Sequence, residues 1–278
     1  IPGMGIHQER RRYHQRHAHA DEPERIVGGE TAGQGEFPYT VSIRQGGYHF
    51  CGGAIIGPRH ILTAAHCLVP LKGRGYNNIA VVTGTNHVRG AGESHRVADM
   101  FYNQAYPESQ QWHNDIGVIK LANPITFNNL QQPIQLPTNP LPTNANVVVS
   151  GWGFIDNSAS MPTLLQKLML KSIRKGECQL YFPRIPIHDN MICTLRNKNF
   201  GTCNGDSGGP LAYGNQIHGV VSGGIPCAHG YPDVFTSVYH HLQFIRQLFR
   251  LAYFTSDHTQ LLLLLLLIHL CFFKTNKI

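Results

Sequence analysis

The stretch GTCNGDSGGP, from Gly201 to Pro210, places one serine between glycines. Glycine has no side chain to cover the Ser207 hydroxyl. It also lets the backbone turn tightly enough to point amide N–H groups at whatever that hydroxyl attacks. A Gly-x-Ser-x-Gly pattern alone is weak evidence, because such runs are common in loops. Here Asp206 stands just before the serine, so the stretch predicts a nucleophile if a histidine and a second aspartate lie elsewhere in the chain.

Bulk properties favour a β-rich protein. The 278 residues suffice for one large all-β domain or two small ones, and 42% are hydrophobic, enough for a real core. Only 14% are charged, whereas 29 Gly and 17 Pro indicate many short strands joined by tight turns. The net charge of +7 is not gathered into one run, and no nucleic-acid motif is visible. A small basic group is either a solvated face or a docking surface for acidic substrates: Lys167, Lys171, Arg174 and Lys175.

The seven cysteines predict disulfides rather than a metal centre. Six lie between Cys51 and Cys227 without a Cys-x-x-Cys spacing, and Cys271 stands apart. Disulfides persist in oxidising compartments, so we expect a secreted, extracellular protein, although the residues alone leave the pairing open. The loop between Val82 and Val97 offers one acid, so calcium is not expected, and no cofactor is predicted.

Short runs with strand character alternate with turn residues along most of the chain. They are Tyr39–Arg44, Ala54–Gly57, Ile61–Ala64, Ile79–Thr83, Arg96–Phe101, Gly117–Leu121, Asn146–Ser150, Leu165–Ser172, Met191–Thr194, Pro210–Ala212, Gln216–Ser222 and Asp233–Ser237. The segment 122–146 is rich in Pro, Asn and Gln and indicates an extended connection between two halves. Residues 238–254 lack Pro and Gly and repeat apolar residues at helical spacing, which predicts a closing helix.

The two ends of the chain have a different character. Residues 1–25 are rich in His and Arg with almost nothing to bury, which predicts a disordered leader; the alternative is metal binding by its histidines. Residues 256–278 contain the apolar run Leu261–Phe273, shorter than the roughly 20 residues that span a bilayer. We favour an unselected tail over a membrane-anchor signal or an interfacial segment.

Six short sequence motifs, one of them within the stretch Gly201–Pro210, follow one another along the chain. They are Ile26-Val27-Gly28-Gly29, Thr63-Ala64-Ala65-His66-Cys67, Asp115-Ile116, Ser150-Gly151-Trp152-Gly153, Gly205-Asp206-Ser207-Gly208-Gly209-Pro210 and Val221-Ser222. With these pieces the chain resembles the trypsin/chymotrypsin-type serine proteases over residues 26 to about 250. The resemblance implies an all-β fold of two antiparallel six-stranded Greek-key β-barrels, at about 26–130 and about 143–237, in a protease domain of residues 26–255. It also implies three disulfides, Cys51–Cys67, Cys178–Cys193 and Cys203–Cys227.

The resemblance assigns chemistry to particular residues. Ser207 would be the nucleophile, His66 would accept its proton and return it to the leaving amine, and Asp115 would fix the imidazole tautomer. The N–H groups of Gly205 and Ser207 would hold the oxyanion. Because these residue types are all present, a non-catalytic homologue that only binds proteins is the disfavoured alternative. The resemblance also implies partners: protein or peptide substrates, an activating protease and protein protease inhibitors.

A cleavage site is implied at Arg25–Ile26. An aspartate buried beside a nucleophile needs a partner, and the new amino group of Ile26 would pair with Asp206 and order the oxyanion loop. Breaking such a pair costs about 3–5 kcal/mol. We therefore interpret residues 1–25 as an activation peptide and the chain as the zymogen of a digestive enzyme. A membrane-tethered regulatory protease, motivated by Leu261–Phe273, is the alternative.

The specificity pocket departs from the pattern of trypsin-like members. They carry an aspartate where this chain has Gly201, followed by Thr202. On the other wall, Ser222-Gly223-Gly224 has a glycine at Gly223 in place of the usual tryptophan, which implies a looser substrate-binding edge, and Asp233 stands where glycine is usual. A wall carboxylate over an open floor is similar to crab collagenase (brachyurin) and implies acceptance of Phe, Tyr and Leu as well as Arg or Lys. If Asp233 points away, the specificity would be chymotrypsin-like.

Overall fold

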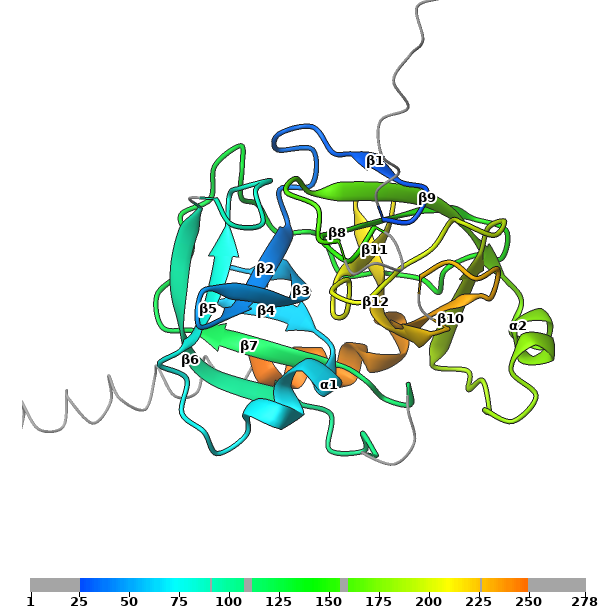
Figure 1. Cartoon of the computed structure of the whole chain (residues 1–278). Coiled ribbons are helices and arrows are strands. Elements are labelled where there is room, and N and C mark those ends of the chain that lie inside the picture. The colour runs from blue at the N-terminus through cyan, green and yellow to red at the C-terminus, as the bar shows by residue number, and fades with distance from the viewer. Residues whose placement is uncertain (1–25, 91, 108–111, 156–159, 226, 250–278) are drawn as a thin grey trace, which may run out of the picture.

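The computed structural model describes residues 26–90, 92–107, 112–155, 160–225 and 227–249, and these fold into two β-barrels (Figure 1). The leader of residues 1–25 and the tail of residues 256–278, with Leu261–Phe273 and Cys271, lie outside the described residues. Within the described ranges, the chain has no helix that combines the length and the apolar character needed to cross a membrane.

The first barrel is a closed ring of six antiparallel strands in the order β2-β3-β4-β7-β6-β5. The strands are β2 Thr40–Gln45, β3 Tyr48–Gly57, β4 His60–Thr63, β5 Ile79–Thr83, β6 Glu93–Tyr102 and β7 Gly117–Leu121. Val41, Ile55 and Ile119 belong to its fully buried core. Because successive side chains of a strand point to opposite faces, such β-branched residues fill the interior while their neighbours face outward.

The second barrel closes in the order β8-β9-β10-β13-β12-β11, with β11 pairing back to β8. Its strands are β8 Asn146–Gly151, β9 Gln166–Ile173, β10 Met191–Leu195, β11 Pro210–Tyr213, β12 Gln216–Gly224 and β13 Asp233–Ser237, and the short β1 Glu30–Thr31 pairs with β9. The two six-stranded antiparallel barrels implied by the sequence are thus confirmed.

Each predicted strand overlaps one of β2 to β13, but some boundaries and the short helices outside residues 238–254 were missed. Strand β3 begins at Tyr48 rather than Ala54, because Gly52 and Gly53 interrupt the strand pattern. Gly52 packs closely against the second barrel, since a Cβ there would lie 3.0 Å from the Gly209 Cα. The short helices are α1 Ala65–Leu68, η1 Val69–Leu71, α2 Lys175–Tyr181 and η2 Tyr239–His241.

The closing helix packs on the first barrel although it follows the last strand of the second. Residues 242–249 are helical after η2, and residues 250–254 of the predicted helix lie outside the described residues. Ile245 is fully buried in the first barrel's core, and the Phe249 ring lies 4.4 Å from the ring of His60. Figure 1 shows this orange helix beside β7. It therefore ties the end of the second barrel to the first.

Hydrogen bonds also join the two barrels near the stretch Gly201–Pro210. The Gly52 amide of β3 donates to the Ser207 carbonyl at 2.7 Å, and the Trp152 indole N–H donates to the Asn86 carbonyl at 2.8 Å. Residues between β7 and β8 form the connection, with isolated bridges but no named strand. The serine of the second barrel is thereby held against the first.

Candidate active site

His66 and Asp115 come from the first barrel and form a close pair. His66 lies on α1, directly after β4, and Asp115 lies just before β7. The His66 Nδ1–H donates to Asp115 Oδ2 at 2.6 Å, and the His66 backbone N–H donates to Oδ1 at 2.8 Å. Two hydroxyls from the second barrel also hold the aspartate: Ser222 Oγ donates to Oδ2 at 2.6 Å, and Thr236 Oγ1 donates to its carbonyl at 2.8 Å.

This pairing sets the protonation chemistry of the histidine. Burial by itself would lower the pKa of His66, but the Asp115 charge and its hydrogen bond together raise that pKa above the ordinary value. In the neutral ring, Nδ1 carries the hydrogen that is donated to the carboxylate. The lone pair of Nε2 is therefore available to accept a proton. The pair can therefore act as a base near neutral pH.

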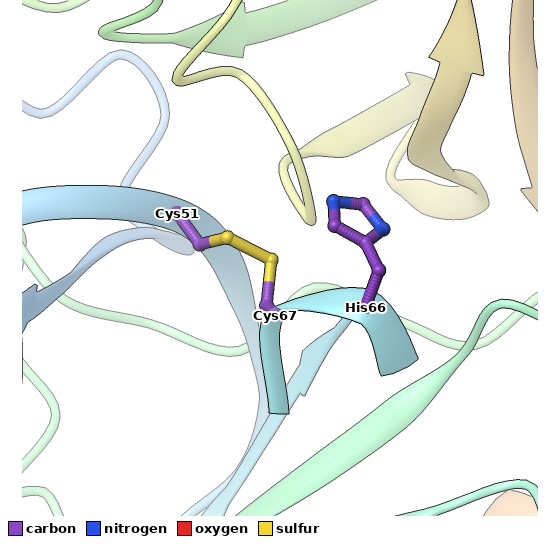
Figure 2. Close-up of side chains that lie close together, drawn as sticks. All are labelled: Cys51, His66 and Cys67. Carbon is purple, nitrogen blue, oxygen red and sulfur yellow. A yellow bond between two sulfur atoms is a disulfide. The ribbon is translucent and has the colours of Figure 1, made fainter. Parts of the chain in front are cut away.

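A disulfide lies directly beside the histidine, as Figure 2 shows. The sulfurs of Cys51 and Cys67 and a ring nitrogen of His66 lie within 4.8 Å of one another. The sulfurs are bonded to each other and are not thiolates, so this group does not have the chemistry of a metal site. The bridge instead fixes α1 to β3. The structure also contains the Cys178–Cys193 and Cys203–Cys227 bridges.

The loop before Ser207 presents unpaired amide donors. Gly205 and Gly208 have φ of +99° and +78°, which glycine adopts without strain. Within the described parts of the chain, the N–H groups of Gly205 and Ser207 donate to no protein acceptor, whereas the Asp206 N–H bonds the Cys203 carbonyl. Ser207 Oγ also makes no hydrogen bond to His66 there. The loop thus offers two donors that an oxyanion can use.

His49 supports this loop and was missed by the sequence analysis. Its Nε2–H donates to the Gly205 carbonyl at 2.9 Å, and its Nδ1 accepts from Ser42 Oγ at 2.9 Å. Burial lowers the pKa of His49 to about 4, so the ring stays neutral and keeps this donor–acceptor arrangement. Nothing in the local sequence signals the contact, because Gly205 lies in the other barrel.

Asp206 is buried without an ion pair among the described residues. Its carboxylate accepts from the Gly153 N–H at 2.8 Å and the Cys203 N–H at 3.0 Å. Burial raises the pKa of Asp206 to about 6, although these two hydrogen bonds act to lower it. A Cβ at Gly151 or Gly153 would come within 2.3 Å of the carboxylate, so both glycines leave room for it.

The start of the described chain packs against the same region. Ile26 is fully buried in the core of the second barrel with Val149 and Val221. The Val27 carbonyl accepts from the Gly201 N–H at 3.2 Å, which brings this start to the beginning of the serine stretch. Arg25, the other side of the predicted cleavage site, lies outside the described residues.

A cavity of about 130 Å³ opens beside Ser207. Its lining comprises Thr202, Cys203, Asn204, Ser207, Val221, Ser222, Gly223, Gly224 and Asp233. Cys203, Asn204 and Val221 were not among the predicted pocket residues. Gly201 was predicted as the pocket floor but lies behind the lining, where a Cβ would sit 3.1 Å from Asp233 Oδ2. The absence of a side chain at Gly201 therefore leaves room for the Asp233 carboxylate.

Asp233 is a buried carboxylate on the wall of this cavity. Its Oδ1 accepts from the Thr202 N–H at 3.0 Å and from Thr202 Oγ1 at 2.7 Å. Burial raises the pKa of Asp233 to about 7, these bonds oppose the rise, and the nearby Asp206 charge adds to it. The cavity consequently has a wall group whose charge changes near neutral pH.

Trp112 fills the space that Gly223 leaves open. A Cβ at Gly223 would lie 1.7 Å from Trp112 Nε1, so no larger residue fits there with the indole in place. The indole packs edge-on against Phe182, with ring centroids 5.3 Å apart, and is almost fully buried. The expected loosening at Gly223 is thus corrected: an aromatic ring from another segment covers this edge. The sequence around Gly223 gives no indication that Trp112 packs there.

Comparisons with known proteins agree with this geometry. Residues 26–245 match the model of the Trypsin family. The chain is 40% identical to Chymotrypsin-2 of Vespa crabro over 224 residues, 80% of this chain and 99% of that protein. It is 38% identical to Hypodermin-B of Hypoderma lineatum, over 77% of this chain and 83% of that protein. It is 34% identical to Trypsin-1 of Astacus astacus, over 80% of this chain and 98% of that protein. The chain therefore belongs to the trypsin family of serine proteases. It is a serine endopeptidase.

Proposed function

We propose that His66, Asp115 and Ser207 form the catalytic triad of a secreted peptidase. The observation that carries this is the hydrogen-bonded series Ser222–Asp115–His66, which spans both barrels next to the cavity that Ser207 lines. His66 would take the proton of Ser207 Oγ during attack and return it to the leaving amine. The free N–H groups of Gly205 and Ser207 would stabilise the oxyanion, where losing one donor costs roughly 100- to 1000-fold in rate.

We further propose that the chain is a zymogen activated by cleavage at Arg25–Ile26. Two observations support this: Asp206 is buried with no cation beside it among the described residues, and Ile26 packs in the same barrel beside the serine stretch. Cleavage would create an ammonium group at Ile26 able to pair with the carboxylate. Asp206 would then ionise fully and hold the oxyanion loop.

The activation step has a direct test. An Arg25→Gln chain, treated with the protease that activates the parent chain, should remain uncut and inactive. Active-site titration with an acylating reagent would show no burst. A matched control, Arg59→Gln, alters an exposed arginine in the turn between β3 and β4 and should activate normally. Full activity of the uncut Arg25→Gln chain would overturn the zymogen proposal.

For substrate preference, we propose that the cavity takes the side chain before the scissile bond and accepts aromatic, aliphatic and basic residues. The support is the place of Asp233 on the cavity wall, held by Thr202, in an otherwise uncharged lining. kcat/KM should be measured on matched peptides with Phe, Leu or Arg at that position. A preference for Phe over Arg above roughly a thousandfold would exceed what one wall charge permits and would favour a chymotrypsin-like specificity instead.

A further inference from the structure

Two histidines from distant parts of the sequence meet close to the segment that carries Asp115. His113 lies two residues before Asp115, and His188 lies in the loop before β10. Their ring centroids are 4.0 Å apart, with the ring planes at 68°. The rings are in contact without a hydrogen bond between them, so ordinary hydrogen bonding does not account for the pairing.

The cluster contains polar atoms that the described protein groups do not satisfy. His113 Nδ1 is inaccessible to solvent and has no hydrogen-bond partner among the described residues, and the same holds for Asn190 Oδ1. A buried polar atom without a partner typically costs about 1–3 kcal/mol, so such atoms need an explanation. Two of them in one cluster point to a missing group that accepts lone pairs.

The surroundings favour a cation over an anion. The Asn190 Oδ1 oxygen carries lone pairs, and His113 Nδ1 carries one in the neutral tautomer that is protonated at Nε2. Asp189 follows His188 in the sequence, and its carboxylate forms an ion pair with Lys175. His241 is committed to Ser237 and Asn114.

We propose that His113 and His188 form a binding site for a divalent transition-metal ion of the class that prefers imidazole, such as Zn²⁺, Ni²⁺ or Cu²⁺. Imidazole nitrogens bind Zn²⁺ at about 2.0–2.1 Å, so two nitrogens that share one ion lie at most about 4 Å apart. Two imidazole rings whose centroids are 4.0 Å apart can bring one nitrogen of each ring within that distance. Water molecules would supply the remaining ligands.

The ion would clamp the segment that carries the catalytic aspartate. Asn114, between His113 and Asp115, accepts from Asn190 Nδ2 at 2.6 Å and contacts His241 Nε2 at 3.1 Å. The 113–115 segment is thus already joined to the loop before β10, and a metal bridge would reinforce that connection. This inference does not depend on the proposed substrate preference or on activation.

The test is a calorimetric titration of Zn²⁺ into the full chain and into three variants. His113→Gln and His188→Gln should each lose one binding event or weaken it at least tenfold. His87→Gln changes an exposed histidine outside the cluster and should bind as the parent does. Binding by the leader histidines or by His66 would persist in all variants; if every Zn²⁺ site persists in both cluster variants, the proposal is wrong.

A second measurement covers the case in which a variant does not fold. Crystals of the parent protein soaked in Zn²⁺ should show an anomalous-scattering peak between the His113 and His188 rings. Zn²⁺ should also raise the Tm of the parent, because an ion that binds only the folded state stabilises it. Peaks found only elsewhere in the molecule would overturn the proposal.

Discussion

The charge state of Asp233 should control the choice between basic and aromatic substrates as the pH changes. The pKa of Asp233 is raised to about 7, so with the cavity free the carboxyl is mostly neutral at pH 5.5 and mostly charged at pH 8.5. The charged fraction rises from about 3% to about 97% over that range. A cationic side chain is attracted only to the charged form, whereas Phe is indifferent to it.

We therefore expect the ratio of kcat/KM for Arg over Phe peptides to rise by up to about 30-fold from pH 5.5 to pH 8.5. The ratio cancels the titration of His66, which both substrates share. Asp233→Asn keeps an oxygen that can accept from Thr202, so it should remove the pH dependence of the ratio and leave the Phe substrate nearly unchanged. A ratio that stays flat across this range in the parent enzyme would refute the reasoning.

The same carboxyl should also make the stability of the fold depend on pH. Its folded-state pKa of about 7 exceeds the ordinary value of 3.8, so the folded chain holds an extra proton between these values. Stability should therefore decrease as the pH rises from about 4 to about 7, by up to roughly 4 kcal/mol from this group. Thermal unfolding of the parent and of Asp233→Asn across this window measures the difference without any substrate.

Three further perturbations test the site. Ser222→Ala removes a charge-assisted hydrogen bond of 2.6 Å to the catalytic carboxylate and should lower kcat/KM about 10-fold or more; a change below twofold would contradict its positioning role. Gly208→Ala places a Cβ 2.2 Å from Thr63 Oγ1 at a φ of +78° and should destabilise the fold by about 3 kcal/mol or more in urea unfolding. Its control, Gly214→Ala, also has a positive φ but open space around it, so it should cost only about 1–2 kcal/mol. Finally, kcat/KM on a Phe peptide should fall as the pH drops through a value above 6.5, because His66 must be neutral to accept a proton and its pKa is raised; a midpoint below 6.5 would show that the carboxylate does not act as described.

Local patterns predicted much of this molecule. Strands β5, β7 and β13 match their predicted bounds, because alternating apolar residues bounded by turn residues carry that information within a few positions. The candidate site residues His66 and Asp115 were predicted from short motifs, and the structure places them 2.6 Å apart.

Local sequence patterns did not predict the contacts between distant segments of the chain. The indole of Trp112 occupies the space at Gly223, and His49 holds the Gly205 carbonyl, across more than 100 residues of sequence in each case. The sequence around each residue is compatible with many partners, so only the three-dimensional arrangement identifies the one present. The direction of Asp233 was open for the same reason, since it depends on Thr202 and on the missing side chain at Gly201.

The packing of residues 242–249 on the first barrel has a consequence for biosynthesis. Ile245 and Phe249 complete a core whose strands leave the ribosome more than 100 residues earlier. Part of the first barrel's apolar core therefore stays uncovered until the last described helix has been synthesised. A ribosome-bound chain that lacks this helix therefore exposes apolar core surface to aggregation and to chaperones.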